Sequence, residues 1–274
     1  MAKFTEVLKN KNFFFLWLGQ VISQFGDRLN QMALIALIYS HAPGSAFALA
    51  KLLSFTIIPV FLIGPIAGVY VDRWNRKYLM IACDILRGLL VLLLPILLID
   101  KKIMPFICLV IFLVFSVTRF FLPAKLSIIP DLVSKDKLLL ANSLTTTTGM
   151  IAAVVGFALG GIIVEEIGVK GSFYLDAATY FISAISIAFI SFKNLVPKTA
   201  EGKNRGLGEI TQDIQEIIKK SIFSDLKEGL KFFVGHKAVS FISNILFVLS
   251  AGVGVVYVVS IVFIQPTHGR QCVF

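Results

Sequence analysis

The sequence predicts an all-α, polytopic membrane protein. Of its 274 residues, 57% are hydrophobic and 15% are charged, whereas about 25% of the residues in a soluble domain are charged. Apolar runs of about 18 or more residues recur along the chain, which is the length that a helix needs to cross a bilayer. These runs are continuous and do not alternate with polar residues, so they favour helices over barrel strands.

The first three helices are expected at residues 13–40, 46–71 and 78–99. The first ends before the run His41–Ser45, which contains proline, glycine and serine. The second ends before the charged run Asp72–Lys77. Such clusters of turn-forming and charged residues interrupt helices, so they mark the two boundaries.

The next three helices are expected at residues 103–129, 138–165 and 171–192. Charged residues at 100–102 precede the fourth helix. The stretch from Pro130 to Lys137 separates the fourth helix from the fifth, and Glu165 to Gly171 separates the fifth from the sixth.

A long polar segment, residues 193–236, separates the sixth helix from a seventh expected at 237–264. Five isoleucines between 210 and 222 fall on one helical face, which indicates an amphipathic helix on the membrane surface. We therefore expect a six-helix half (1–192), an amphipathic linker (193–236), a seventh helix (237–264) and an atypical, disordered tail (265–274).

Lysine and arginine are concentrated in alternate loops, and this bias predicts an orientation. The N-terminal segment and the loops at 72–77, 130–137 and 193–236 hold most of them, while the loops at 100–102 and 165–171 hold few. Cytoplasmic loops are the richer in basic residues. We expect a cytoplasmic N-terminus in the cell membrane, and the net charge of +10 then reflects topology and not a nucleic-acid partner.

Polar side chains form a stripe along the first helix. Gln20, Gln24, Asp27 and Gln31 are spaced four, three and four residues apart, which places them on one face. Such a stripe avoids lipid by lining a water-filled cavity or by packing on other helices. Asp27 lies near the middle of the span, where loss of water favours proton binding. We interpret Asp27 as a proton-coupling residue; the alternative is a structural carboxylate neutralised by Arg28 or another basic group.

Other ionisable residues also lie inside the predicted helices. Arg119 is about 24 Å from the outer end of its helix at 1.5 Å per residue. It either pairs with a cavity carboxylate or reaches the cytoplasmic surface. Asp84 and Arg87 are three residues apart and are expected to form an ion pair. Asp176, one turn into the sixth helix, is expected to have an interfacial structural role.

Small residues recur on one face of the fifth helix. They are Thr145, Gly149, Ala153, Gly156 and Gly160, with Gly161 adjacent. Small residues at four-residue spacing let two helix backbones approach closely. We expect a helix-packing face here, either fixed or sliding.

The junction of the second and third helices reads Gly64-Pro65-Ile66-Ala67-Gly68-Val69-Tyr70-Val71-Asp72-Arg73-Trp74-Asn75-Arg76-Lys77. It resembles the signature loop of the major facilitator superfamily, in which Gly68, Asp72, Arg73, Arg76 and Lys77 match the pattern. Asn75 replaces the usual glycine, and because Asn tolerates the left-handed conformation we expect the turn to be kept. The resemblance implies a conformational gate at this loop.

Further segments are similar to an efflux branch that includes macrolide exporters and the enterobactin exporter. They begin at Arg119-Phe120-Phe121-Leu122-Pro123-Ala124 and at Ala141-Asn142-Ser143-Leu144. The run Val155-Gly156-Phe157-Ala158-Leu159-Gly160-Gly161 resembles the antiporter motif of the fifth helix, with Phe157 at the usual proline. Arg119 matches the arginine of a fourth-helix antiporter motif whose glycines are absent here.

The resemblance implies the N-terminal six-helix bundle of a major facilitator fold plus one further transmembrane helix. We expect a chain truncated after the seventh span, whose full-length parent adds a C-terminal half. The implied function is secondary active transport, as a proton-coupled exporter of a drug-like or siderophore-like small molecule. Its partners are then the lipid bilayer, the substrate and protons. The alternatives are a carrier of lysophospholipids or another solute, and a non-functional remnant.

The sequence does not favour an enzyme. The histidines and cysteines do not cluster, and no paired catalytic carboxylates or phosphate-binding loop are found; the residues are His41, His236, His268, Cys83, Cys108 and Cys272. We therefore expect no catalytic residue, no metal site and no cofactor.

Overall fold

The computed structural model describes residues 4–43, 45–71, 74–98 and 104–191, with 235, 239–245, 248–250, 252, 254–256 and 259. Helices account for most of these residues, and no strand occurs among them. The bundle formed by residues 4–191 lies in one unit, and the described residues between 235 and 259 belong to another.

The chain begins with a short helix and one long helix. α1 (Phe4–Leu8) is followed by α2 (Lys11–His41). Asn10 starts α2 as its N-cap, because its side-chain oxygen accepts hydrogen bonds from the backbone N–H groups of Asn12 and Phe13 at 3.0 and 3.3 Å. The helix predicted at 13–40 is therefore present.

The second predicted span is interrupted. α3 (Ala46–Leu62) is capped by Ser45, whose hydroxyl accepts from the Ala48 N–H at 3.2 Å, and α4 (Gly64–Val71) follows after a turn at Ile63. The expectation of one continuous helix over 46–71 is corrected. Pro59 lies inside α3, and Pro65 follows the break. A proline has no backbone N–H and clashes with the preceding turn of a helix, so the two prolines weaken the helical hydrogen bonds around Ile63.

The third and fourth spans are α5 (Arg76–Leu97) and α6 (Met104–Leu132). α6 continues three residues beyond the predicted end at 129, through Pro130. A proline removes only its own hydrogen bond, and the helix accommodates it. The chain then turns through the 3₁₀ helix η2 (Lys135–Lys137).

The predicted fifth and sixth helices meet at a single residue. α7 (Leu138–Ala188) is helical throughout except at Gly168, where φ is 73° and ψ is 171°. We call residues 138–167 the first arm of α7 and residues 169–188 the second arm. A loop over 165–171 was expected, but Gly168 alone supplies the reversal, because glycine adopts positive φ without a steric penalty. The second arm ends at Ala188, short of 192.

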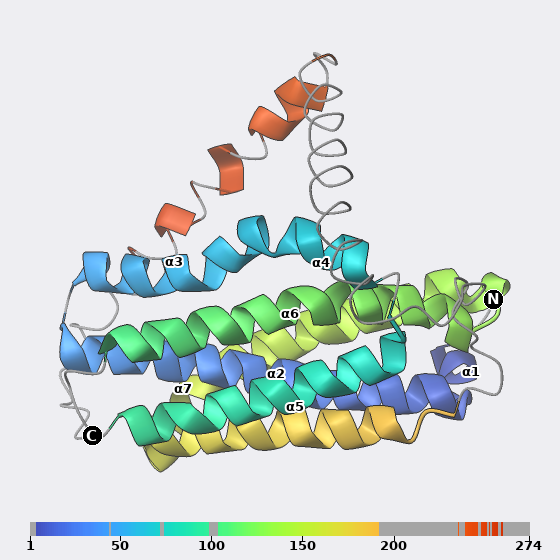
Figure 1. The fold of residues 1–274 in the computed structure, drawn as a ribbon, viewed down its shortest axis with the longest axis horizontal. Coiled ribbons are helices and arrows are strands. Elements are labelled where there is room, and N and C mark those ends of the chain that lie inside the picture. The colour runs from blue at the N-terminus through green and yellow to red at the C-terminus, as the bar shows by residue number, and fades with distance from the viewer. Residues whose placement is uncertain are drawn as a thin grey trace, which may run out of the picture. The chain divides into compact units, whose positions relative to one another are not determined.

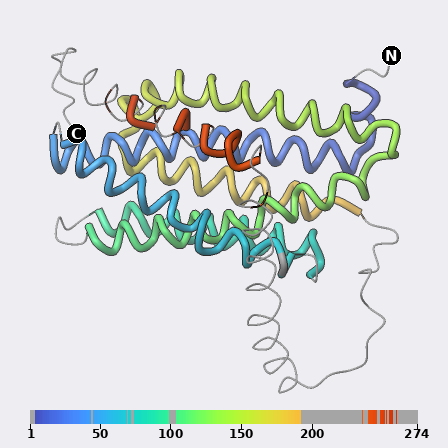
Figure 2. Tube along the Cα trace, turned by 90° about the horizontal axis from the view of Figure 1, so that it is seen from above, coloured from blue at the N-terminus to red at the C-terminus, as the bar shows by residue number. Residues whose placement is uncertain are grey.

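Successive spans run in alternate directions within the bundle (Figure 1). α2 packs along α7, α5 packs against both α6 and α7, and α3 and α4 pack on α6. Figure 2 shows the same bundle from above, with α2 beside the arms of α7. The starts of α2 and α5 thereby share one end of the bundle with the end of α6.

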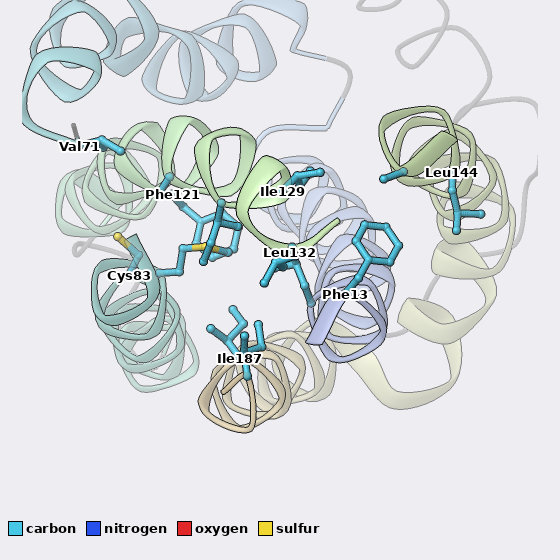
Figure 3. Packing of buried hydrophobic residues seen from close by; sticks show 14 of the residues in the cluster. Phe13, Val71, Cys83, Phe121, Ile129, Leu132, Leu144 and Ile187 are labelled. Atoms are coloured by element: carbon cyan, nitrogen blue, oxygen red, sulfur yellow. The ribbon is translucent and has the colours of Figure 1, made fainter. Parts of the chain in front are cut away.

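An apolar core fills this end of the bundle (Figure 3). Phe13 from α2, Cys83 from α5, Phe121 from α6 and Ile187 from the second arm are buried there. Between helices in a bilayer, such side chains stabilise the bundle through close van der Waals packing. Asp84 directly follows Cys83 in α5, so this buried carboxyl group lies next to the apolar core.

Several of the described helices are long and apolar, as in a multi-pass membrane protein. By length and composition, Arg76–Leu97, Met104–Leu132, the stretch Lys135–Ala188 and Val239–Val256 can each cross a membrane. α3 is a shorter apolar helix, and α2 has 31 residues but carries the polar stripe. Large apolar side chains on the outside, such as Phe47 and Val154, suit contact with lipid chains.

Several sequence expectations fall outside the described residues. These are the linker at 193–236 apart from Gly235, the tail at 265–274, the charged loop at 100–102, and Asp72 and Arg73 of the signature loop. The division into domains therefore stays a prediction.

Candidate functional site

The polar stripe of α2 is buried at Gln20 and half-buried at Gln24, Asp27 and Gln31. The Gln24 amide donates to the backbone oxygen of Gln20 at 3.1 Å. At the other end of the stripe, Gln31 accepts from the Arg28 guanidinium at 3.1 Å. Both bonds stay within α2, and among the described residues the side-chain hydrogen bond from the stripe to another helix is made by Asp27.

Asp27 is half-buried and meets the second arm of α7. The Tyr180 hydroxyl donates a hydrogen bond to Asp27 Oδ1 at 2.5 Å. Tyr180 is only 2% exposed, so this bond joins two helices in the interior. The Tyr180 hydroxyl therefore fixes the position of the Asp27 carboxyl group relative to the second arm.

A buried ion pair lies on the other side of Tyr180. The Arg87 guanidinium bonds to the Asp84 carboxylate within α5, which confirms the predicted local pair. Both are nearly inaccessible, at 2% and 0% exposure. Arg87 lies 4.5 Å from the ring centre of Tyr180 and 4.3 Å from that of Phe121, so aromatic rings also contact the cation. Arg87 thus holds the ring whose hydroxyl meets Asp27.

Asp176 and Lys125 complete a group that sequence reasoning did not assemble. Asp176 Oδ2 accepts from the Asn30 amide at 2.6 Å, and Asp176 is fully buried, contrary to the interfacial position expected for it. Lys125, which lies within the predicted fourth helix, is in α6 within electrostatic range of Asp27 and Arg87. We call the following residues the buried polar cluster: Asp27, Asn30, Asp84, Arg87, Lys125, Asp176 and Tyr180.

Arg119 lies away from these contacts. Its Nε donates to the backbone oxygen of Phe115 in its own helix at 3.4 Å, and no carboxylate of the described chain forms an ion pair with it. Lys125, six residues later in α6, faces the cluster instead.

The basic residues of the signature loop bind helix ends. Arg76 pairs with Asp131 of α6 at 2.7 Å, and Lys77 Nζ donates to the backbone oxygens of Ala188 and Ile190 at 2.8 and 2.7 Å. A cation at a helix C-terminus is favourable because the last carbonyl groups lack partners. Gly68 is in α4 with open space around its Cα.

Asn75 does not adopt the expected left-handed conformation. Its φ and ψ are −67° and 110°, and its side chain caps α5 by accepting from the N–H groups of Lys77 and Tyr78 at 3.1 and 3.4 Å. The turn is therefore stabilised by an N-cap, which a glycine could not supply through a side chain.

The small residues of the first arm contact α2. Gly149 lies against the side chain of Gln24, Gly156 against Arg28, and Gly160 against Met32. Gly161 faces open space. The glycine face therefore brings the first arm close to the helix that carries the stripe.

An apolar pocket of about 380 Å³ lies between α2 and α7. Its lining residues are Val21, Ile22, Phe25, Thr148, Ile151, Ala152, Val155 and Thr179. A volume of about 300–1,000 Å³ with a mainly apolar lining is usual for sites that take small organic molecules. Within the described ranges, no group of three His, Cys, Asp or Glu residues could hold a metal ion.

Together these residues place three carboxylates and two cations in an apolar interior. Burial penalises unpaired charge, so such a group can bind or release a proton when the packing around it changes. A carboxylate whose neighbours come from several helices also couples its charge to the positions of those helices.

Comparison with known proteins yields one family and several relatives. Residues 16–271 match the family described as the Major Facilitator Superfamily. The chain is 27% identical over 235 residues to an uncharacterised MFS-type transporter, YkuC, of Bacillus subtilis, covering 85% of this chain and 52% of that protein. It is 30% identical over 237 residues to the putative bacilysin exporter BacE of Bacillus subtilis, covering 86% and 53%.

A third relative is the macrolide efflux protein A of Streptococcus pyogenes. It is 24% identical over 184 residues, covering 67% of this chain and 45% of that protein. The chain therefore spans about half the length of the curated relatives that it matches.

Proposed function

We propose that this chain, which belongs to the major facilitator superfamily, forms one helical half of a secondary active transporter that exports a small molecule. The family and the relatives compared are transporters and not enzymes. Two relatives are named for bacilysin export and macrolide efflux, and export by this chain is inferred from its similarity to them.

The buried polar cluster is the observation that carries the proposal. Ionisable groups inside a membrane span cost about 2.5–3.5 kcal/mol each on insertion scales, and they mark ion and substrate pathways. Here they come from α2, α5, α6 and the second arm of α7, and they meet beside Asp27. A merely structural role would be served by apolar packing at lower cost.

We propose proton exchange as the driving reaction, with Asp27 as the coupling carboxylate. Its only described side-chain hydrogen bond to another helix is from the neutral Tyr180 hydroxyl. A half-buried carboxylate held in this way can lose its partner when the helices shift, which ties its surroundings to the arrangement of the helices.

The substrate class proposed is a drug-like or siderophore-like organic molecule. The apolar pocket between α2 and α7 supports an apolar body, and the polar stripe supports a few oriented polar contacts. Since the chain spans about half of its relatives, we propose that a second helix bundle completes the cavity.

We also propose a cell-membrane location with a cytoplasmic N-terminus. The start of α2, the start of α5 and η2 lie at one end of the bundle and carry Lys9, Lys11, Arg76, Lys77, Lys135 and Lys137. The positive-inside rule assigns this end to the cytoplasm.

The test is drug uptake into inside-out membrane vesicles that contain the full-length protein, driven by an imposed pH gradient. Asp27→Asn keeps the side-chain size but cannot titrate, so it should abolish uptake that depends on the gradient while leaving membrane insertion intact. The control is Glu165→Gln, which removes an exposed carboxylate near the end of the first arm of α7 and should transport normally. Unchanged gradient-driven uptake by Asp27→Asn would show that Asp27 is structural.

A further inference from the structure

Asp176 has an environment that suits a neutral acid better than a carboxylate ion. It is fully buried, and one oxygen, Oδ2, accepts the Asn30 amide hydrogen at 2.6 Å. The other oxygen, Oδ1, is buried and has no hydrogen-bond partner among the described residues. An ionised carboxylate has room for several hydrogen-bond donors, and an unmatched buried oxygen is costly.

Thr179 offers the missing partner, but as an acceptor. Its hydroxyl donates to the backbone oxygen of Asp176 at 2.7 Å, so the hydroxyl hydrogen is already used. The Thr179 hydroxyl also lies beside the Asp176 carboxyl group, and both crowd the space over Gly26. A hydrogen on Asp176 Oδ1 would satisfy the contact, since hydroxyl oxygen lone pairs accept hydrogen bonds.

Asp176 forms no ion pair with a cation of the described residues, although Arg87 lies in electrostatic range of it. On α5, Arg87 is paired with Asp84. On α6, Lys125 lies in electrostatic range of Asp27 and Arg87. On α2, Arg28 binds Gln31 and lies over the Phe157 ring.

The remaining neighbours make an ionised Asp176 still less favourable. Asp27 on α2 is an acid in electrostatic range, and Tyr180 on the same arm is neutral and donates to Asp27. The cluster therefore contains three carboxylates and two cations, and one proton balances it. A lone buried carboxylate ion would cost far more than a protonated one.

We propose that Asp176 binds a proton on Oδ1 in this conformation and is a second proton-binding site of the chain, beside Asp27. The bound proton is donated to the Thr179 hydroxyl oxygen, while Asn30 donates to the other carboxyl oxygen. Gly26 of α2 packs closely over this group, and Thr179 also lines the apolar pocket. The proton therefore exchanges with water through that pocket or when α2 and the second arm separate. The role of this site in transport rests on the proposed function, whereas the presence of the proton on Asp176 does not depend on it.

Infrared spectroscopy of the full chain in liposomes tests the proton directly and requires no transport. At pH 7 the wild type should show the carbonyl band of a protonated carboxyl group. Asp176→Asn should lose this band, and Asp27→Asn should keep it. Absence of the band in the folded wild type, its persistence in Asp176→Asn, or its loss in Asp27→Asn alone would each overturn the proposal.

A milder pair of variants covers the case in which Asp176→Asn does not fold. Thr179→Val removes the acceptor and should shift the frequency of the band. Thr118→Val, whose hydroxyl bonds only to its own helix, should leave the band in place. An unshifted band in Thr179→Val would contradict the assigned contact.

Thermal unfolding provides an independent comparison between two buried acids. Asn is nearly isosteric with neutral Asp, so Asp176→Asn should unfold within about 2 °C of the wild type, whereas Asp84→Asn strands the Arg87 charge and should unfold at least about 6 °C lower. Equal losses would mean that Asp176 is ionised. If the wild type shows the band but no gradient-driven uptake, the proposed transport role of Asp27 is rejected, whereas the proton site at Asp176 is not.

Discussion

Arg87 and Tyr180 show how single residues position the candidate proton-coupling group. The Arg87 guanidinium is held by Asp84 and by the rings of Phe121 and Tyr180, and the Tyr180 hydroxyl then reaches Asp27. The ring contact and the hydroxyl contact are separable, because phenylalanine keeps the first and lacks the second.

Tyr180→Phe should therefore weaken gradient-driven transport without unfolding the bundle. The variant keeps the ring contact with Arg87 and removes the hydrogen bond that positions Asp27, while Asp84, Arg87, Lys125 and Asp176 remain as neighbours. A hydrogen bond to a charged group contributes about 1.5–3 kcal/mol, so uptake driven by the pH gradient should fall by roughly tenfold or more.

The measurement is uptake into vesicles over a series of pH values, and the matched control is Tyr174→Phe, an exposed tyrosine of the same arm. Tyr174→Phe should keep the wild-type profile. Uptake by Tyr180→Phe that matches the wild type at every pH would show that the hydroxyl contact does not position Asp27 for transport.

At the scale of helices, glycines set how closely α2 approaches α7. A Cβ atom on Gly26 would collide with the side chains of Thr179 and Asp176, and one on Gly19 would press on Ser183 and Ser186. The second arm thus lies tightly against α2, and the contact includes the buried carboxyl group.

Gly26→Ala should destabilise this contact. Overpacking a tight interior costs about 1–3 kcal/mol, which exceeds the gain of about 0.5–1 kcal/mol that alanine brings to a helix interior. Gly161→Ala is the control, since Gly161 lies in the same bundle with open space around it and should show only the gain. Thermal unfolding in detergent measures both, and equal stabilities for the two variants would refute the tight contact.

At the scale of the whole molecule, the alternation of the spans separates two ends of the bundle. Lys135 in η2 lies at the end with the starts of α2 and α5, and Lys170, just after Gly168, lies at the other. Both side chains are exposed. Charge bias predicts that the first end is cytoplasmic.

Cysteine labelling in intact cells checks this orientation. In a background whose three cysteines are replaced, Lys170→Cys should react with an impermeant maleimide, and Lys135→Cys should react only after the cells are permeabilised. Labelling of position 135 and not 170 in intact cells would reverse the assigned topology.

Hydropathy and turn residues were sufficient to locate most of the helices. Long apolar runs exclude water from the backbone and so require helices, and this holds whatever the neighbours are. Boundaries were wrong where prolines were involved: Pro65 helps to divide the second span, whereas Pro130 lies inside α6. A proline removes one hydrogen bond in either case, and the packing around it determines whether the helix continues.

The polar face of α2 was also readable from the residues alone, because side chains three and four residues apart share a helix face. The partners of that face were not readable in this way. Tyr180 lies 153 positions from Asp27, and Asp176 lies 146 positions from Asn30, so only the packing of α2 on the second arm brings them together. A repeating pattern describes one helix at a time. The close approach at Gly26, which aligns two helices and buries Asp176, depends on side chains from both.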